Sequence, residues 1–351
     1  MSRWVFAIGA IGAALLTACA QALPGGQESG LTALSSARLT AMLLTQPAPS
    51  HPDRGHSWML PDAAKVKELL YVSDWGTDDV FIYNYRTRAL VGRLTGFAKP
   101  YGQCVDKGGN VWITNLDSTA VVEFAHGGVT RLKTLHGAGH SAGCSVDPTT
   151  GNLAVANLDL PAELQIYKKA AGSANVFKSS ACDEDMWSPG YGKKGNLYVE
   201  GSNASIVTVC ELEHDGTTLR GPVKLLNFTI GLGGGVMWDG THLILTDQYY
   251  GGQTITAVYQ VTEEQSGNLQ KAGSTVLKDA SCDGGVRVPQ PFVVGAKNTP
   301  LNQTQGTAIV GGNLQCLSLF NLWHYPAGGG PLSRLQSPPT QPFGESVSIA
   351  P

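Results

Sequence analysis

One phrase of this sequence recurs along the chain, and its recurrence restricts the folds that are available. The clearest copy starts at residue 101 and reads YGQCVDKGGNVWITNLDSTAVVEFAH. Its Asn-Leu-Asp triplet at 115–117 returns at 157–159, a step of 42 residues. Each copy alternates apolar, β-branched runs with Gly-Asn and Asn-Leu-Asp turns, which predicts short antiparallel strands joined by tight turns. Such a unit cannot bury its apolar face alone, so it must pack on its neighbours.

Six copies of the unit align on their second strand. These segments are Leu69–Asp74, Asn110–Asn115, Asn152–Asn157, Asn196–Gly201, His242–Asp247 and Thr307–Gly312. Their last residues are 41, 42, 44, 46 and 65 residues apart. A third strand and a shorter fourth strand are expected after each, with the fourth strand at 222–226 in the fourth unit. Four-stranded units with a period of about 40–45 residues predict an all-β fold, a six-bladed β-propeller over residues 63–351.

The first and last units are incomplete in complementary ways. Nothing between Pro61 and Leu69 resembles the inner-strand phrase YGQCVD, whereas residues 342–350 read PFGESVSIA and match that phrase. We therefore expect the C-terminal strand to be the inner strand of the first blade, with Val347 and Ile349 packed inside it. This pairing would close the ring and remove its open edges. The inner strand of the sixth unit is expected at 284–288 or at 291–296.

Composition and charge narrow the class of partner. Hydrophobic residues make up 42% of the 351 residues, which is enough for a sizeable core. Charged residues make up only 15%, and the formal net charge is −3. Because no basic stripe is present to neutralise phosphates, we expect no nucleic-acid partner.

Residues 1–18 predict a lipoprotein signal peptide. Arg3 precedes an apolar stretch, 4–16, that is short for a membrane span. The Leu-Thr-Ala-Cys sequence that follows resembles the bacterial lipobox, which implies cleavage before Cys19 and attachment of lipid to its sulfur. The alternative is an ordinary secretory signal that is cut after Ala18 or Ala20.

Residues 19–62 lack strand patterning and contain several prolines, which predicts a lipidated tether or linker. Alternatively, part of this segment packs along the outside of the domain. Acyl chains on Cys19 would anchor the protein to a membrane. Ala20, not Asp, follows the cysteine, and by resemblance to Gram-negative lipoproteins this implies a place in the cell envelope, at the outer membrane or cell surface.

The units resemble NHL-type repeats, in which the inner strand ends in Asp and a Gly-Asn turn leads to an apolar strand that ends in Asp or Asn. The resemblance covers residues 66–351 and is clearest in the second and third units. The senescence-marker/gluconolactonase family uses the same six-bladed shape, with ligands bound near one end of the central channel. A shared shape does not by itself transfer a reaction.

Polar residues end most of the second strands and are expected near that end of the channel. They are Asp74, Asn115, Asn157 and Asp247, with Glu200 one residue before the end of its strand. A gluconolactonase-like site implies that such oxygen ligands hold Ca²⁺ or another divalent metal in a metal-dependent lactonase or hydrolase. The alternative is that each side chain accepts hydrogen bonds from the backbone of its own turn.

Aromatic residues are expected at the same end of the blades, and they are Trp75, Tyr101, Trp187, Tyr249 and Tyr250. They could stack on a sugar, line a protein-binding surface or belong to the core. His136 and His140 lie in an HGAGH loop whose glycines disfavour a metal-binding helix. The sequence contains no Walker or HExxH motif. It therefore favours a non-catalytic lipoprotein whose propeller binds a protein or saccharide partner, with the lactonase as the alternative.

Seven cysteines are present, and six remain once Cys19 is set apart. Six is an even number in a chain that is expected to be exported, where disulfides form. The positions favour a Cys282–Cys316 bond, allow Cys104–Cys144, and give Cys182–Cys210 the least support. The alternative is buried free thiols. No pair has the spacing of a zinc finger.

Overall fold

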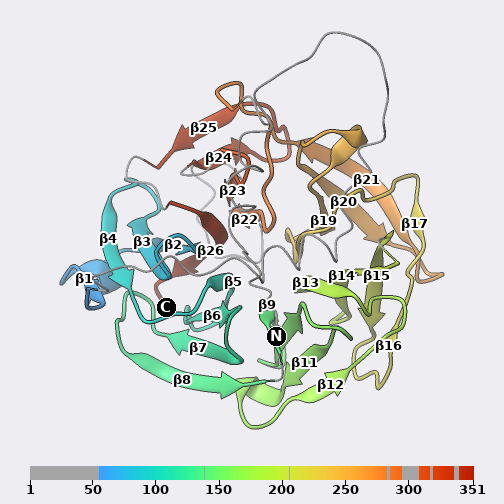
Figure 1. The fold of residues 1–351 in the computed structure, drawn as a ribbon, viewed down its shortest axis with the longest axis horizontal. Coiled ribbons are helices and arrows are strands. Elements are labelled where there is room, and N and C mark those ends of the chain that lie inside the picture. Colours follow the sequence, from blue (N-terminus) through green and yellow to red (C-terminus); the bar gives the residue numbers. More distant parts are fainter. Residues whose placement is uncertain are drawn as a thin grey trace, which may run out of the picture. The chain divides into compact units, whose positions relative to one another are not determined.

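The computed structural model describes residues 55–137, 139–204, 206–282, 285–294, 308–316, 319–335 and 340–351. These residues belong to one compact unit that spans 35–351. Their strands form six sheets arranged as blades around a central axis (Figure 1). The six-bladed β-propeller predicted from the repeats is therefore confirmed. The predicted signal peptide, Cys19 and most of the predicted tether lie outside the described residues.

Blade 1 contains five strands, and blades 2 and 3 contain four consecutive strands each. Blade 1 contains β1 (Trp58–Met59), β2 (Glu68–Asp74), β3 (Asp79–Asn84), β4 (Leu90–Leu94) and β26 (Pro342–Ile349). Blade 2 contains β5 (Pro100–Val105), β6 (Val111–Asn115), β7 (Ala120–Phe124) and β8 (Arg131–His136). Blade 3 contains β9 (Ser141–Val146), β10 (Leu153–Asn157), β11 (Leu164–Tyr167) and β12 (Asn175–Phe177). Strand β1 lies in the segment expected to be a tether, and it pairs with β4 on the outer edge of blade 1.

The last three blades depart further from the expected strand limits. Blade 4 contains β13 (Asp185–Tyr191), β14 (Leu197–Asn203), β15 (Ile206–Leu212) and β16 (Leu219–Arg220). Blade 5 contains β17 (Leu225–Leu226), β18 (Val236–Trp238), β19 (Leu243–Asp247), β20 (Ala257–Glu263) and β21 (Leu269–Val276). Blade 6 contains β22 (Phe292–Val294), β23 (Ala308–Gly312), β24 (Phe320–His324) and β25 (Pro331–Arg334).

Two expectations about these strands can now be decided. The inner strand of blade 6 lies within the second predicted range, 291–296. The prediction of a fourth strand at 222–226 in blade 4 was wrong, because β16 takes that place. Residues 225–226 form β17, which pairs in parallel with β21 of the next blade.

Three short 3-10 helices lie between strands, and they are η1 (Ala63–Lys65), η2 (Lys168–Ala170) and η3 (Tyr250–Gly252). Among the residues that the structure describes, no helix has the length and apolar character needed to cross a membrane.

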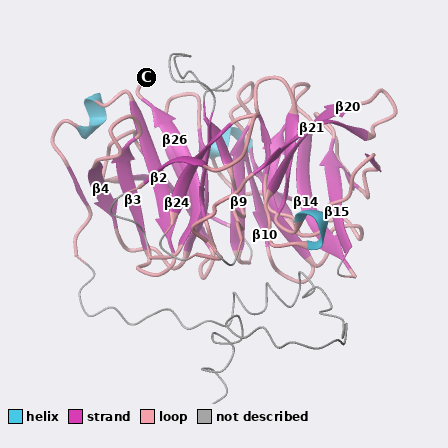
Figure 2. Cartoon of the chain, turned by 90° about the horizontal axis from the view of Figure 1, so that it is seen from above, coloured by secondary structure: helices cyan, strands magenta, loops and turns pink. Residues whose placement is uncertain are grey.

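The strands run between two faces of the ring (Figure 2). On one face, hairpins join the inner strands of blades 2 to 5 to their second strands; we call this the hairpin face. The other face carries the turns between second and third strands and the connections between blades; we call this the crossover face. The end of β26 lies on the hairpin face (Figure 2).

Apolar side chains fill the spaces between neighbouring blades. Six buried clusters are present, one for each pair of adjacent blades. The cluster between blades 1 and 6, for example, joins Leu70 and Val347 to Val310 and Phe320. Side chains of a strand point alternately to its two faces, so each blade contributes to both of its neighbours. The blades therefore depend on one another for a core.

Strand β26 closes the ring by pairing antiparallel with β2. The register places Val347 opposite Leu70 and Ile349 opposite Glu68. Val347 is buried in the cluster between blades 1 and 6. The C-terminal strand is thus the inner strand of blade 1, as predicted from its match to the inner-strand phrase.

A buried histidine ties this closing strand to blade 2. His126 Nδ1 lies 2.7 Å from Ser348 Oγ, and its Nε2 lies 2.7 Å from the carbonyl oxygen of Val66. Burial lowers the pKa of His126, and the Val66 carbonyl partly offsets this effect. The neutral imidazole therefore links the connection before β2 with β26.

The three predicted disulfides are all present. Cys104–Cys144 joins the inner strands β5 and β9 of blades 2 and 3. Cys182–Cys210 links the segment before β13 to β15, and Cys282–Cys316 links the segments on either side of β22 and β23. The pairing with the least support from the sequence forms as well, so none of these six cysteines is a free thiol.

Deletion of residues 343–351 should prevent soluble folding. Without β26, the inner edge of β2 loses its backbone partners, and each buried group left unpaired costs about 1–3 kcal/mol. Several such losses approach the whole stability of a domain, about 5–15 kcal/mol. Solubility and thermal unfolding of the truncated protein should be compared with those of a variant lacking only Pro351. A truncated protein with parent-like thermal stability would contradict the closure.

Candidate functional site

The structure places the predicted polar column on the crossover face, at the ends of the second strands. Asp74 is fully buried there. Its Oδ1 accepts hydrogen bonds from the backbone N–H groups of Gly76 (3.1 Å) and Gln341 (2.6 Å). Its Oδ2 accepts from Thr77 Oγ1 (2.8 Å) and Thr340 N (3.0 Å). Asp74 therefore caps its own turn and also holds the chain that enters β26.

The two asparagines of the column also bond to nearby backbone. Asn115 Oδ1 accepts from Ala98 N at 3.0 Å, and Asn157 Oδ1 accepts from Glu163 N at 2.7 Å. Both side chains are buried. Their amide oxygens thus stabilise the connections on either side of their own strands.

The two remaining carboxylates lie at the junction of blades 4 and 5. Asp247 Oδ1 accepts from Tyr249 N at 2.9 Å. Glu200 accepts from Gly234 N (2.6 Å) through Oε2 and from Thr246 N (2.7 Å) through Oε1. Burial raises the pKa of Glu200 well above its usual value, although the two N–H donors oppose this rise and Asp247 adds to it. Glu200 therefore binds blade 4 to blade 5 through backbone donors.

These side chains do not converge on a common point. Within the described part of the chain, no three or more His, Cys, Asp or Glu side chains gather in an arrangement that could hold a metal ion. The oxygens that could serve as ligands accept hydrogen bonds from backbone groups or neighbouring side chains.

Three of the predicted aromatic residues pack into a buried cluster at the start of the inner strands. Trp75 stacks on Phe343 with ring centroids 4.4 Å apart, and Tyr101 lies 4.2 Å from the same ring. Trp187 belongs to the same cluster, together with Leu116, Ala142 and Leu158. Trp75, Tyr101 and Trp187 are at most 5% exposed, so they have little surface to offer a ligand. We call this cluster the aromatic plug; it lies at the crossover face.

The other predicted residues lie away from the axis. Tyr250 packs in blade 5, with its ring centroid 6.2 Å from that of Tyr259, and Tyr249 is half-buried beside it. His140 Nδ1 lies 2.6 Å from Asp159 Oδ1, and its ring is partly exposed. The structure therefore does not bring the predicted aromatic residues together on one open surface.

A cavity of about 480 Å³ opens instead at the hairpin face of the channel. It lies within the size range of small-molecule sites, about 300–1,000 Å³. Inner strands of all six blades line it. The lining includes Gln103, Cys104, Val105, Cys144, Val146, Ser188, Tyr191, Val236, Met237, Trp238, Gln290, Phe292, Glu345, Val347 and Ile349.

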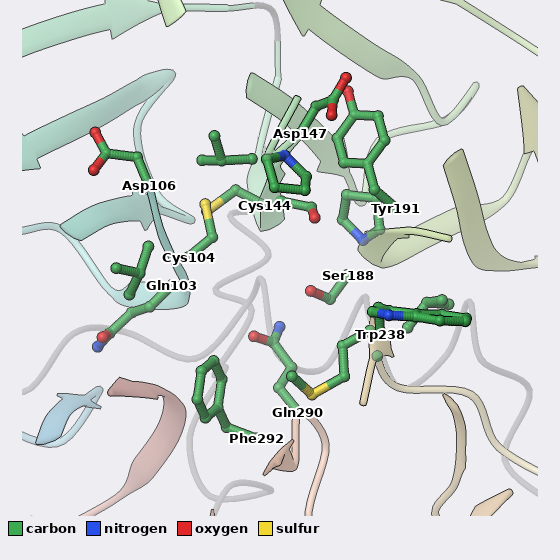
Figure 3. Close-up of a pocket in the computed structure, with 18 of the residues that line it drawn as sticks. Gln103, Cys104, Asp106, Cys144, Asp147, Ser188, Tyr191, Trp238, Gln290 and Phe292 are labelled. Atoms are coloured by element: carbon green, nitrogen blue, oxygen red, sulfur yellow. A yellow bond between two sulfur atoms is a disulfide. The ribbon is translucent and has the colours of Figure 1, made fainter. Parts of the chain in front are cut away.

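The cavity wall is largely apolar and aromatic. Trp238, Phe292 and Tyr191 face the space from blades 5, 6 and 4, as Figure 3 shows. The Cys104–Cys144 disulfide forms the wall on the opposite side (Figure 3). Each of the three aromatic side chains is only partly buried, so part of its surface is available for contact.

The rim carries charges of both signs. Asp106 and Asp147 end the inner strands of blades 2 and 3, while Lys107 and Lys193 are exposed in the hairpins. The acids also cap their hairpins, since Asp106 accepts from Gly108 N at 2.8 Å. The rim therefore does not select strongly for either an anion or a cation.

Gln290 forms the floor of the cavity. Its Cα and Cγ lie 3.7 and 3.9 Å from the position that a Cβ on Gly235 of blade 5 would occupy. Its Oε1 lies 2.9 Å from the corresponding position on Gly102 of blade 2. The side chain thus extends from blade 6 across the axis, and Figure 3 shows its amide near the middle of the cavity beside Ser188. Its Nε2 is buried without a hydrogen-bond partner.

Glu345 on β26 is a buried acid among the lining residues. It is 2% exposed, and its carboxyl oxygens have no side-chain hydrogen-bond partner among the described residues. Burial raises the pKa of Glu345 well above its usual value, and the backbone N–H of Gly312 offsets only part of this rise. A buried polar group without a partner destabilises a fold, and such groups are concentrated at functional sites.

Sequence reasoning did not identify this cavity, although one signal was present. The inner strands of blades 2 and 3 end in Val-Asp, at 105–106 and 146–147, whereas that of blade 5 ends in Trp238-Asp239. Trp238 of blade 5 thus stands where blades 2 and 3 have a valine, and this difference indicates an aromatic section of the channel wall. The residues that form the floor come from blades distant in sequence, so only the folded ring reveals them together.

Comparisons with known proteins support the fold and assign no function. No family model and no curated protein matches the sequence. A propeller from a crystal structure of a nidogen/laminin complex is 13% identical, covering 81% of this chain and 99% of that chain, with a TM-score of 0.56. A protein of unknown function from Bacteroides caccae is 15% identical, covering 80% and 99%, with a TM-score of 0.52. A functionally unknown protein from Desulfotomaculum acetoxidans is 11% identical, covering 81% and 100%, with a TM-score of 0.52. At these identities the likeness shows the fold alone, and the resemblance to NHL repeats stays a prediction.

Glu345→Gln should stabilise the protein at neutral pH. Burial raises the pKa of Glu345 in the folded chain, so this carboxyl favours folding fully below its unfolded pKa, and that contribution is lost as the pH rises. Glutamine cannot ionise, so its contribution does not change with pH. The free energy of unfolding of both proteins should be measured with urea at about pH 4 and about pH 7.5. Between these two pH values, the difference should shift in favour of the variant by on the order of 1–3 kcal/mol. An equal difference between the two proteins at both pH values would contradict this account.

Proposed function

We propose that this protein is an exported, lipid-anchored binding protein of the cell envelope whose propeller takes a small ligand into the cavity at the hairpin face. The observation that carries this proposal is the cavity of about 480 Å³, because partly exposed aromatic side chains from three blades line it. A pocket that is mostly apolar with a few convergent polar groups is the usual form of a small-molecule site. The lactonase alternative has no comparable support, because the predicted metal ligands bond to their own surroundings.

Two features support export and anchoring. The six cysteines of the propeller form three disulfides, which persist in oxidising compartments outside the cytosol. The Leu-Thr-Ala-Cys sequence at 16–19 supplies a cysteine directly after an apolar segment. Lipid attached to Cys19 would hold the propeller at a membrane surface, at the outer membrane by the resemblance already described.

Cys19→Ala should release the protein from membranes or leave it unprocessed. The substitution removes the sulfur to which lipid would be attached, while the propeller cysteines stay intact. Membrane fractionation and the intact mass of the mature protein measure both effects. Cys19→Ser, which is nearly the same size but cannot form the thioether, should behave in the same way. If membrane association and mature mass are unchanged in both variants, the anchor is disproved.

Trp238→Ala should weaken the binding of small molecules in the cavity. A soluble fragment library would be screened by saturation-transfer NMR. Fragments that compete with one another for one site would then be ranked by affinity. Loss of the Trp238 ring removes a large aromatic surface from the wall, so affinity for these fragments should fall by about tenfold or more.

Trp58→Ala is the matched control, because Trp58 lies on β1 at the outer edge of blade 1 and is 41% exposed. This variant should keep the affinity of the parent. Trp238→Tyr keeps a ring in the wall and tests whether any loss comes from unfolding. Fragments that bind equally well to the parent and to Trp238→Ala would disprove the cavity as the binding site.

A further inference from the structure

The long polar side chains of the cavity lining are closed to a ligand. Gln103 Nε2 donates to Ser73 Oγ at 2.8 Å, and Gln103 Oε1 accepts from Ser346 Oγ at 2.9 Å. The Nε2 atom of Gln290 and the carboxyl oxygens of Glu345 are buried. A ligand therefore has little to gain from hydrogen bonds to these three side chains.

The remaining charges of the described lining lie at the rim. Asp106 and Asp147 accept hydrogen bonds from backbone N–H groups of their own hairpins, while Lys107 and Lys193 are exposed to water. Below the rim, the one charged residue of the described lining is Glu345, near the middle of β26. A charged group that passed the rim would lose its water without reaching an opposite charge, and such a transfer is costly. The lining therefore favours an uncharged ligand.

The surface that is left to a ligand is apolar, aromatic and sulfur-containing. Trp238 and Phe292 face the cavity and are partly exposed, as Figure 3 shows. Met237 lines the cavity beside Trp238, and the Cys104–Cys144 disulfide forms the opposite wall. Aromatic rings make favourable contacts with other rings and with a methionine sulfur, beyond what burial of their area contributes. An aliphatic molecule of the same size would lack these contacts.

We propose that the cavity binds an uncharged, planar aromatic molecule with its ring against Trp238. This inference rests on the proposed function of the cavity and adds the chemical class of its ligand. The volume of about 480 Å³ lies in the range of sites that enclose most of a small organic ligand. The ligand is held by contact and undergoes no reaction.

The test uses probes that share a size and differ in charge or in aromaticity. The full chain would be titrated by calorimetry with naphthamide, which is uncharged and planar. Naphthoate and naphthylmethylammonium add a negative and a positive charge, and each should bind about tenfold more weakly. Decalin carboxamide is the saturated counterpart of naphthamide. It should bind about two- to tenfold more weakly, because it lacks the contacts between rings.

A substitution at Trp238 connects this preference to the cavity. Trp238→Leu keeps an apolar side chain but removes the ring, so naphthamide should lose its advantage over decalin carboxamide. Trp238→Phe keeps a ring, should retain the advantage, and covers the case in which leucine disturbs folding. Trp58→Leu is the matched control on β1, where Trp58 is 41% exposed outside the cavity, and it should bind both probes as the parent does.

Each outcome decides the proposal. If naphthamide does not bind, or binds no more tightly than its charged or saturated counterparts, the proposed ligand class is wrong. The cavity keeps its proposed function in that case if screened fragments bind the parent and Trp238→Ala weakens them. If naphthamide binds, but Trp238→Leu and Trp238→Ala bind every probe as the parent does, the site lies elsewhere and both proposals fail.

Discussion

The pairing of β26 with β2 is the interaction on which the rest of the structure depends. Six core clusters each lie between two adjacent blades, so no blade has a complete core until the ring is closed. The closing strand is held by more than its ladder. Asp74 accepts from the backbone of Thr340 and Gln341, and Ser346 Oγ donates to Gln103 Oε1 at 2.9 Å. These side chains connect β26 to both blade 1 and blade 2, so the closure involves more than one sheet.

The two ends of the channel serve different purposes. At the crossover face, aromatic rings are buried and the predicted polar side chains accept hydrogen bonds from the backbone, which stabilises the ring. At the hairpin face, the lining retains buried polar groups that no side chain of the described chain satisfies. Glu200 and Glu345 show the contrast, since burial raises the pKa of both carboxyl groups. Glu200 has two backbone donors that join neighbouring blades, whereas Glu345 has no side-chain donor within the described chain.

The repeats allowed the blade count, the second strands and the closure to be predicted, because each follows from a periodic pattern in the chain. The fourth strand of blade 4 could not be predicted, because residues 225–226 find their partner in blade 5. The position of the candidate site was harder to predict from the sequence than the strands were. An Asp or Asn at the end of a strand has the same sequence signature whether it binds a metal or caps a turn, as Asp74 and Asn115 do here. The cavity is formed by single residues spaced a blade apart, and Gln290 reaches its place only by crossing the axis.

The Gln290 side chain extends from blade 6 toward blade 2 beneath the cavity, so a molecule in the cavity lies between this side chain and the hairpins. It then passes the lysines and aspartates of the hairpins on its way in and on its way out. A change at the rim would alter both rates, while the equilibrium affinity is set deeper inside. Such an arrangement suits capture and retention of a molecule.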